Sequence, residues 1–156
     1  MSKVVAICQS NYIPWKGYFD MINMADMFVL YDDMQYTRRD WRNRNKIKTP
    51  SGLQWLTIPI DVKGRYYQKI NETKLSDMQW AKKHWDKIKY AYGKSLYFDM
   101  YKSVFEDLYM NELQGVELLS EINKLLVKKL CSILDINTKI MCSTEFQLLE
   151  DRNERL

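Results

Sequence analysis

The chain begins with an apolar run followed by a polar loop and a helical pattern. Lys3–Cys8 is short, rich in β-branched residues and without polar alternation, which is typical of a strand buried on both faces of a parallel sheet. Gln9–Asn11 end the run, and Pro14 sets the earliest start of a helix. From Trp15 onward apolar residues recur at helical spacing.

A second solid apolar run, Met27–Tyr31, ends abruptly at Asp32 and Asp33. Strand, loop, helix and strand in this order predict a β-α-β unit. Functional groups collect at the carboxyl ends of the strands in such units, and both ends are polar here.

The next part of the chain predicts a β-hairpin. Pro50-Ser51-Gly52 is a turn signal, and Leu53–Ile60 alternates as a strand that pairs with Asn45–Lys48. A weaker pattern over Tyr66–Leu75 suggests another strand.

The second half of the chain is mainly helical. Apolar residues at helical spacing predict three helices and a final short strand: Met78–Tyr92, Leu96–Met110, Val116–Leu134 and Thr138–Cys142. We therefore predict one α/β domain over residues 1–156, with a Rossmann-like parallel sheet core, a β-hairpin and a helical segment.

Composition narrows the class of protein. The chain has 156 residues, 46% of them hydrophobic and 28% charged, which suits one folded domain. It has no apolar run of the ~18–20 residues that a membrane span needs, and no signal-peptide pattern. Its three cysteines form no CxxC pair, and its single histidine excludes a multi-histidine metal site. We expect a cytoplasmic protein with no membrane segment.

Charge is concentrated in one segment. Arg38–Lys48 holds six basic residues and one acid, so it carries +5 while the whole chain carries +4. Such a patch favours a phosphate-bearing small molecule or a nucleic acid as partner.

The loop after the first strand is the first candidate site. Gln9 and Asn11 offer amide groups, Tyr12 and Trp15 offer rings, and the following helix points backbone N–H groups at an anion. Alternatively, the polar side chains cap the helix while the rings pack.

Asp32 and Asp33 are the second candidate. A carboxylate pair at a strand end can bind Mg²⁺, hold a sugar hydroxyl or act as a general base. Two adjacent aspartates in a solvated turn are the alternative.

The basic segment is the third candidate site. Arginine forks bind phosphate, and an indole stacks on a base, so we single out Arg39, Trp41, Arg42, Arg44 and Lys46. The alternative is a charged edge strand. Six basic residues in eleven exceed what edge protection needs, so we favour ligand binding.

His84 is the fourth candidate. It shares a helix face with Trp80 and Ile88, a position where histidine is more often a packing residue than a catalyst.

Four stretches together resemble the WbqC-like protein family. They are spread along the chain between residues 9 and 98: QSNYIPWKGYFD at 9–20, DDMQYTRRDWRNRNKIK at 32–48, QWLTIP at 54–59 and HWDKIKYAYGKSLYF at 84–98. Ser10 departs from the proline that the family usually has, while Gln9, Asn11 and Pro14 are kept.

The resemblance implies a role in bacterial O-antigen (lipopolysaccharide) and other surface-polysaccharide synthesis. It implies a transferase that moves glycine or another acyl group to a nucleotide-linked sugar. On this view Gln9 and Asn11 meet phosphate or sugar, the basic segment holds the diphosphate, and Asp33 or His84 is the general base.

The same resemblance implies a longer protein, because members continue by some tens of residues with a helix that begins near Asn153. We therefore expect a C-terminally truncated domain whose open sheet edge is covered by a second copy or another segment, or else a fragment with an exposed apolar face.

Two other functions stay open. One is a non-catalytic nucleotide- or RNA-binding protein, with nucleic acid the less favoured partner. The other is a nucleotidyltransferase-like enzyme with Mg²⁺ at Asp32 and Asp33, since the loop is loosely similar to HIGH-type enzymes but lacks their histidines.

A single site requires that Arg42 or Arg44 reach the Gln9–Asn11 loop and Asp33. We also expect His84 to face the cleft.

Overall fold

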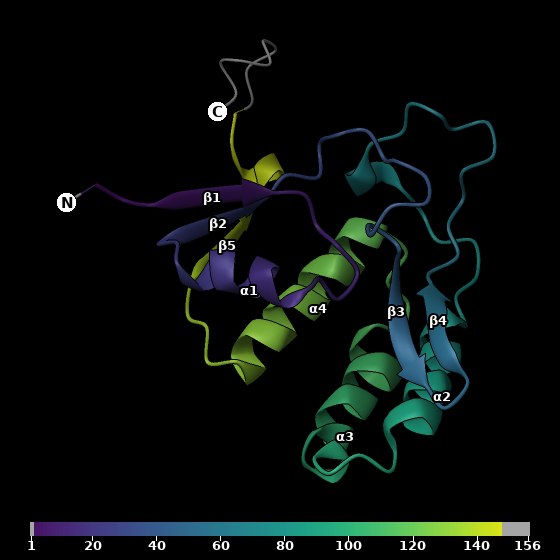
Figure 1. Ribbon diagram of the computed structural model, residues 1–156. Helices are drawn as coiled ribbons and strands as arrows, with labels where there is room; N and C mark the ends of the chain where they lie inside the picture. Colours follow the sequence, from purple (N-terminus) through teal and green to yellow (C-terminus); the bar gives the residue numbers. More distant parts are fainter. Residues whose placement is uncertain (1, 148–156) are drawn as a thin grey trace.

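The computed structural model describes residues 2–147 and contains a parallel sheet, a hairpin and a helical layer (Figure 1). Strands β1 (Val5–Cys8), β2 (Met27–Leu30) and β5 (Lys139–Cys142) pair in parallel in the order β1-β2-β5. The predicted α/β class and the parallel β-α-β unit are confirmed.

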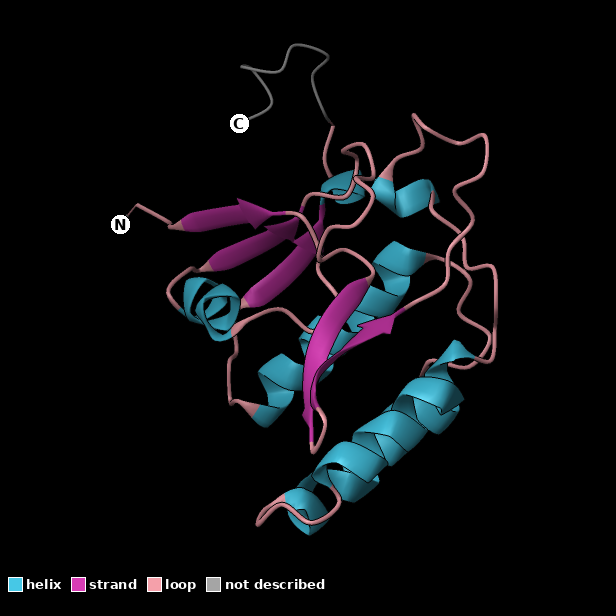
Figure 2. Cartoon of the chain, turned by 45° about the vertical axis from the view of Figure 1, so that its right-hand side comes forward, coloured by secondary structure: helices cyan, strands magenta, loops and turns pink. Residues whose placement is uncertain are grey.

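The two faces of this sheet differ. Phe28, Leu30 and Ile140 share one face and pack on α1 (Lys16–Asn23) and α4 (Leu119–Ile133). Val5 and Ile7 point to the opposite face and are 49% and 39% exposed. Figure 2 shows both helices on one side of the sheet. The prediction that the first strand is buried on both faces is wrong, because β1 is an edge strand and the described helices cover only one of its faces.

The predicted hairpin is confirmed. Strands β3 (Arg44–Thr49) and β4 (Gly52–Thr57) are antiparallel, and Gly52 at the turn has a φ of 109° that favours glycine. Ile47 and Leu56 are buried in the core, whereas Lys46 and Trp55 form a cross-strand pair on the outer face.

The predicted helices are also confirmed. They are α2 (Trp80–Tyr92), α3 (Phe98–Asp107) with a π-helical extension to Glu112, and α4, each beginning two or three residues later than predicted.

Tyr66–Leu75 does not form a strand. It contains a 3-10 turn over Ile70–Glu72 and only isolated bridges. Its backbone donates instead to the segment after β2, with Asn71 N bonded to Asp32 O at 3.0 Å. These bonds hold the turn against the end of β2.

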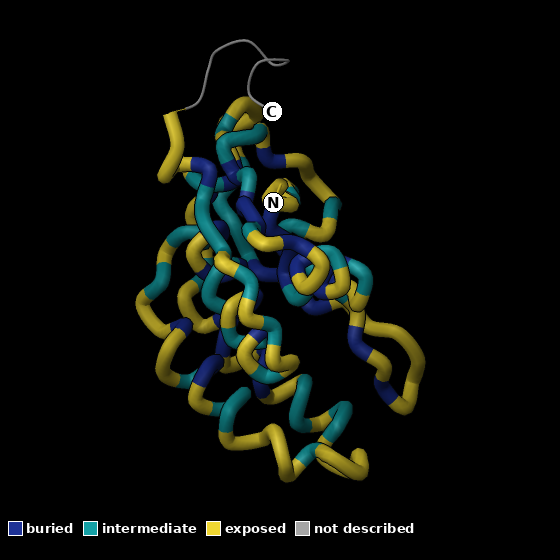
Figure 3. Tube along the Cα trace, turned by 90° about the vertical axis from the view of Figure 1, so that its left-hand side faces the viewer, coloured by how far each residue is buried: buried dark blue, intermediate teal, exposed yellow. Residues whose placement is uncertain are grey.

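Helix α4 lies between two hydrophobic cores. Ile122 and Leu126 join the core built around Trp80, Trp85 and Tyr109, and Val127 and Cys131 join the core under the sheet, with Tyr18 and Phe28. Figure 3 shows buried stretches of the chain mainly toward the middle of the molecule, with exposed stretches around them. Helix α4 therefore lies between the hairpin and the loops at the carboxyl ends of the strands.

The expected helix near Asn153 lies outside the described residues. Over residues 2–147, every helix falls short of the length and apolar character needed to cross a bilayer.

Because the helices cover only one face of the sheet, an isoleucine-to-alanine substitution should cost more stability on the covered side than on the open face. Ile22 on α1 is fully buried, and we expect Ile22→Ala to lower the free energy of unfolding by about 2–5 kcal/mol through loss of burial and a new cavity. Ile7→Ala, the control on the open face, should cost less than about 1 kcal/mol. Urea denaturation measures both, and equal costs would show that the β1 face is covered in solution.

Candidate functional site

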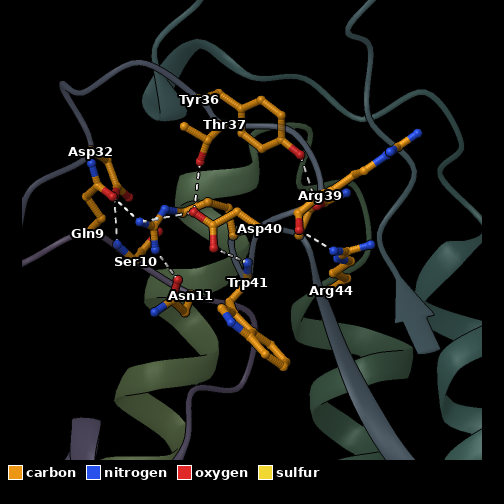
Figure 4. Close-up of polar contacts among 12 residues, drawn as sticks. Gln9, Ser10, Asn11, Asp32, Tyr36, Thr37, Arg39, Asp40, Trp41 and Arg44 are labelled. Atoms are coloured by element: carbon orange, nitrogen blue, oxygen red, sulfur yellow. Dashed lines mark hydrogen bonds and ion pairs between the residues drawn. The ribbon is translucent and has the colours of Figure 1, made fainter. Parts of the chain in front are cut away.

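The Arg42 side chain joins the basic segment to the first loop. Its two terminal nitrogens donate to the Asn11 Oδ1 and Gln9 Oε1 amide oxygens, and its side chain is only 14% exposed. Asp40 Oδ2 lies 3.6 Å from the guanidinium. Figure 4 shows Gln9, Asn11 and Asp40 turned toward this point. The predicted meeting of the basic segment with the strand-end loop is confirmed through Arg42.

Backbone contacts fix the rest of this loop to the same segment. Tyr12 N donates to Trp41 O at 3.0 Å, and the Asn45 side-chain amide donates to the carbonyls of Tyr12 and Ile13. Ile13 has a φ of 47°, a strained value for a β-branched residue, which these contacts maintain. Neither Gln9 nor Asn11 caps α1, so the capping alternative does not describe the loop.

Asp32 orders the loop from the neighbouring strand. Its Oδ1 accepts the Ser10 N–H at 2.8 Å, and the residue is buried. Burial raises the pKa of this carboxyl, while the Ser10 hydrogen bonds and the Arg42 charge oppose the rise. The carboxylate therefore has partners on the side that faces the loop.

Asp33 belongs to a separate cluster at the ends of β2 and β5. It accepts hydrogen bonds from the Ser143 hydroxyl and from Asn71 Nδ2, the latter at 3.2 Å, and Lys69 Nζ lies 3.9 Å away. A cavity of about 240 Å³ is lined by Asn71, Ser143 and Asp32 among other residues. Hydroxyl, amide and carboxylate groups in one cavity suit a sugar.

The carboxylate pair is engaged by hydrogen-bond donors. Over residues 2–147, no group of three or more His, Cys, Asp or Glu side chains comes together as a metal site. Ser10 N–H donates to Asp32, and Asn71 and Ser143 donate to Asp33, so one oxygen of Asp32 and both oxygens of Asp33 have a protein partner.

Arg44 does not reach the loop. Its Nη2 donates to the Arg39 carbonyl, and its guanidinium lies 4.2 Å from the Trp55 ring centroid. The contact predicted for Arg42 or Arg44 is made by Arg42, and the structure joins neither arginine to Asp33. Register explains the difference, because Arg44 starts β3 with its side chain on the outer face of the hairpin.

Trp41, Arg44, Lys46 and Trp55 form what we call the basic-aromatic face. The two indoles are 5.5 Å apart between centroids, and Lys46 Nζ lies 4.7 Å from the Trp55 ring. Trp41 and Trp55 are 49% and 40% exposed. Among the described residues, Arg42 is the only cation of Arg38–Lys48 within 4.0 Å of a carboxylate. The face thus offers exposed rings and unpaired positive charge.

His84 is buried, at 4% exposure, and the expectation that it faces a cleft is wrong. Its Nδ1 lies 2.8 Å from the Tyr12 hydroxyl and its Nε2 lies 3.1 Å from Thr57 O. The Tyr12 hydroxyl also lies 2.7 Å from the Tyr109 hydroxyl. The residue is packed inward because it shares its helix face with Trp80, whose ring lies edge-on at 5.1 Å.

One arrangement of protons satisfies this chain. Thr57 O can only accept, so His84 Nε2 carries the hydrogen and Nδ1 accepts from Tyr12, which accepts from Tyr109. Burial lowers the pKa of His84 to about 4, with the Thr57 carbonyl opposing. Neutral His84 therefore holds Tyr12, and with it the loop, in place.

Trp15 and Arg39 lie apart from the Arg42 contacts. Trp15 is exposed, and its ring lies against Gly17, where a Cβ would come within 1.7 Å of it. Arg39 is exposed, with a φ of 62°, and contributes its carbonyl to Arg44.

Sequence reasoning missed Asn123. It is fully buried in α4, and its Nδ2 donates to Ser10 Oγ at 3.1 Å and to Arg42 O at 2.9 Å. A polar residue on the apolar face of α4 was the available signal. Asn123 Oδ1 and Arg42 Nε are buried without a partner among the described residues, which leaves an acceptor and a donor at this junction. Asn71 and Ser143 were missed as well.

Comparison with known proteins places the chain in a family. The sequence profile of the WbqC-like protein family matches residues 9–156, which include the loop, Arg42, Asp33 and Asn123. The chain belongs to the WbqC-like protein family. It is 47% identical over 154 residues to the uncharacterized protein Rv1507c of Mycobacterium tuberculosis (strain ATCC 25618 / H37Rv). This match covers 99% of the chain and 66% of the relative, so the WbqC-like chain spans slightly less than two thirds of that protein. No solved structure matches it significantly.

The buried histidine of this WbqC-like chain predicts a loss of stability in acid. The folded pKa of about 4 lies below the ordinary 6.5, so the unfolded chain binds more protons between these values. The stabilisation is complete above pH 6.5 and falls by about 3 kcal/mol as the pH drops toward 4. Urea denaturation at stepped pH measures the effect.

The control is His84→Gln, which keeps a donor and an acceptor but does not titrate. The stability of this variant still depends on pH through every other titrating group, including Asp32. The difference between the stability–pH curves of the two proteins therefore isolates the contribution of His84. Parallel curves for the two proteins would contradict the buried, neutral state.

Proposed function

We propose that this chain is part of a transferase that modifies a sugar carried on a nucleotide diphosphate, in the synthesis of a surface polysaccharide. Membership of the WbqC-like family supports the class, and the site supports the type of substrate. The group transferred, on this proposal, is glycine or another acyl group.

The basic-aromatic face would hold the nucleotide. Trp41 and Trp55 present exposed rings on which a base can stack, and Lys46 and Arg44 stand beside them with charge for the diphosphate.

The sugar would lie at the carboxyl ends of β2 and β5. The cavity there places carboxylate, amide and hydroxyl groups against its hydroxyls. Asp33 does not line this cavity but is bonded to Ser143 and Asn71, which do. On this proposal Asp33 takes a proton from the sugar hydroxyl or amine as that group attacks the carbonyl of the acyl donor and the donor's leaving group departs. His84 has a positioning role, because its ring nitrogens are occupied and buried.

One observation carries the proposal. Arg42 binds Gln9 and Asn11 while its sequence neighbour Trp41 belongs to the basic-aromatic face. Since Ser10 of the same loop is bonded to Asp32, a chain of buried and partly buried hydrogen bonds joins the basic-aromatic face to the carboxylate end of the sheet, which supports one site built from both.

Single-stranded RNA binding is the second candidate. Adjacent exposed indoles with unpaired cations are also typical of proteins on which successive bases stack. The strand-end cavity has no part in that function.

Thermal unfolding with nucleotide sugars tests the proposal. UDP- and dTDP-sugars at millimolar concentration should raise the melting temperature, since a ligand at about 100 times its Kd stabilises by about 2.7 kcal/mol. Loss of a charged contact in Arg44→Ala should weaken binding by about 1–3 kcal/mol. Arg65→Ala is the control, because Arg65 is an exposed arginine paired with Asp61 outside the site.

The outcomes separate the candidates. Unchanged affinity in Arg44→Ala would remove the basic-aromatic face from nucleotide binding. A steep fall of oligonucleotide affinity with salt, without any effect of nucleotide sugars, would favour RNA binding. Loss of nucleotide-sugar binding on chelation would favour Mg²⁺ at Asp32 and Asp33.

A further inference from the structure

A second and larger cavity lies between the hairpin and helices α2 and α3. Its volume is about 360 Å³, within the ~300–1,000 Å³ typical of small-molecule pockets. The indoles of the basic-aromatic face lie on the other side of the hairpin, because Ile47 and Leu56 line the cavity while Trp55 points outward, and Lys46 is the one residue of that face that also borders the cavity. The nucleotide and sugar positions proposed above leave this cavity unused.

The wall of the cavity is apolar. The hairpin, α2 and α3 each contribute two large hydrophobic side chains: Ile47, Leu56, Trp85, Ile88, Phe98 and Phe105. Such a surface favours a hydrocarbon chain or an aromatic ring. Tyr97 and Tyr101 also line it and are exposed, which places its opening at α3.

The charge on the lining has one sign. Lys46 and Lys102 are its charged residues, and no acidic residue lines it. The Lys46 ammonium is directed to the Trp55 ring, 4.7 Å from its centroid, so Lys102 supplies the charge at this cavity. Lys102 is exposed on α3 between Phe98 and Phe105, and among residues 2–147 no carboxylate lies within 4.0 Å of its ammonium. An unpaired cation at the opening of an apolar cavity selects a ligand with an anionic end.

We propose that this cavity binds an apolar carboxylate, with its acyl chain or aromatic ring between the hairpin and α3 and its carboxylate at Lys102. The inference goes beyond the proposed function, since it concerns a different surface and requires neither nucleotide nor sugar. It names the ligand class by chemistry: a medium-chain or aromatic carboxylic acid.

Calorimetry with a matched pair of ligands tests the charge. Decanoate should bind more tightly than decan-1-ol, by roughly tenfold for a charge-assisted contact. Lys102→Gln should remove this preference and leave decan-1-ol binding unchanged. Lys82→Gln, which removes an exposed lysine of α2 that does not line the cavity, is the control and should keep the preference.

A chain-length series tests the apolar wall. From butyrate to decanoate, affinity should rise about fourfold per methylene while the chain is being buried. Ile88→Trp, which fills the cavity, should abolish binding of both decanoate and decan-1-ol. If that variant does not fold, the Lys102→Gln comparison still decides the proposal.

Three results would overturn it: no saturable decanoate binding, equal affinity for decanoate and decan-1-ol, or a preference for decanoate that survives Lys102→Gln. The test is independent of the proposed function, because all titrations omit nucleotide sugars. Arg44→Ala should bind decanoate normally, so a failure at one site is distinguishable from a failure at the other.

Discussion

A nearly buried guanidinium controls the arrangement of this protein. Removing an arginine from water is costly unless its N–H groups find acceptors, and Arg42 finds two of them in the side chains of Gln9 and Asn11. Asp40 at 3.6 Å supplies the opposite charge. Meeting this requirement draws the loop after β1 against the residues before β3. The positions of Tyr12 and Trp41, and hence of the basic-aromatic face, follow from it.

Two further buried polar contacts support that junction from below. Asn123 of α4 donates hydrogen bonds to Ser10 Oγ and to the Arg42 carbonyl. Helix α4 therefore fixes the position of the loop relative to the sheet. Tyr12 is fixed in turn by His84 and Tyr109. Leaving any of these groups unpaired in the interior costs about 1–3 kcal/mol, so together they select one conformation of the strained Ile13 backbone.

The local sequence pattern was sufficient to predict most of the helices and strands and part of the site. The β-α-β unit, the hairpin and the helices follow from periodicity and turn residues, which act over short stretches. The approach of the basic segment to the loop followed from strand ends and unbalanced charge. Whether Arg42 or Arg44 makes the contact depends on where β3 begins, and that is a matter of register.

Other features depend on residues far away in the chain. His84 is buried because Tyr12 and Thr57, 72 and 27 residues away in the chain, provide hydrogen-bond partners for its ring nitrogens inside the core. The bond from Asn123 to Ser10 spans 113 residues. The exposure of Val5 and Ile7 depends on which face α1 and α4 cover, and an apolar run looks the same whether one face or two are buried.

A double-mutant cycle between Arg42→Ala and Asn11→Ala, measured by urea denaturation, tests the central claim most directly. If the guanidinium holds the loop, the two costs are coupled by about 1–3 kcal/mol. Arg38→Ala with Asn11→Ala is the matched control, because Arg38 donates to Val62 O instead, and its cost should add to that of Asn11→Ala within about 0.5 kcal/mol. Simple additivity for Arg42 and Asn11 as well would contradict the account, since the loop and the basic segment would then be held together by other contacts.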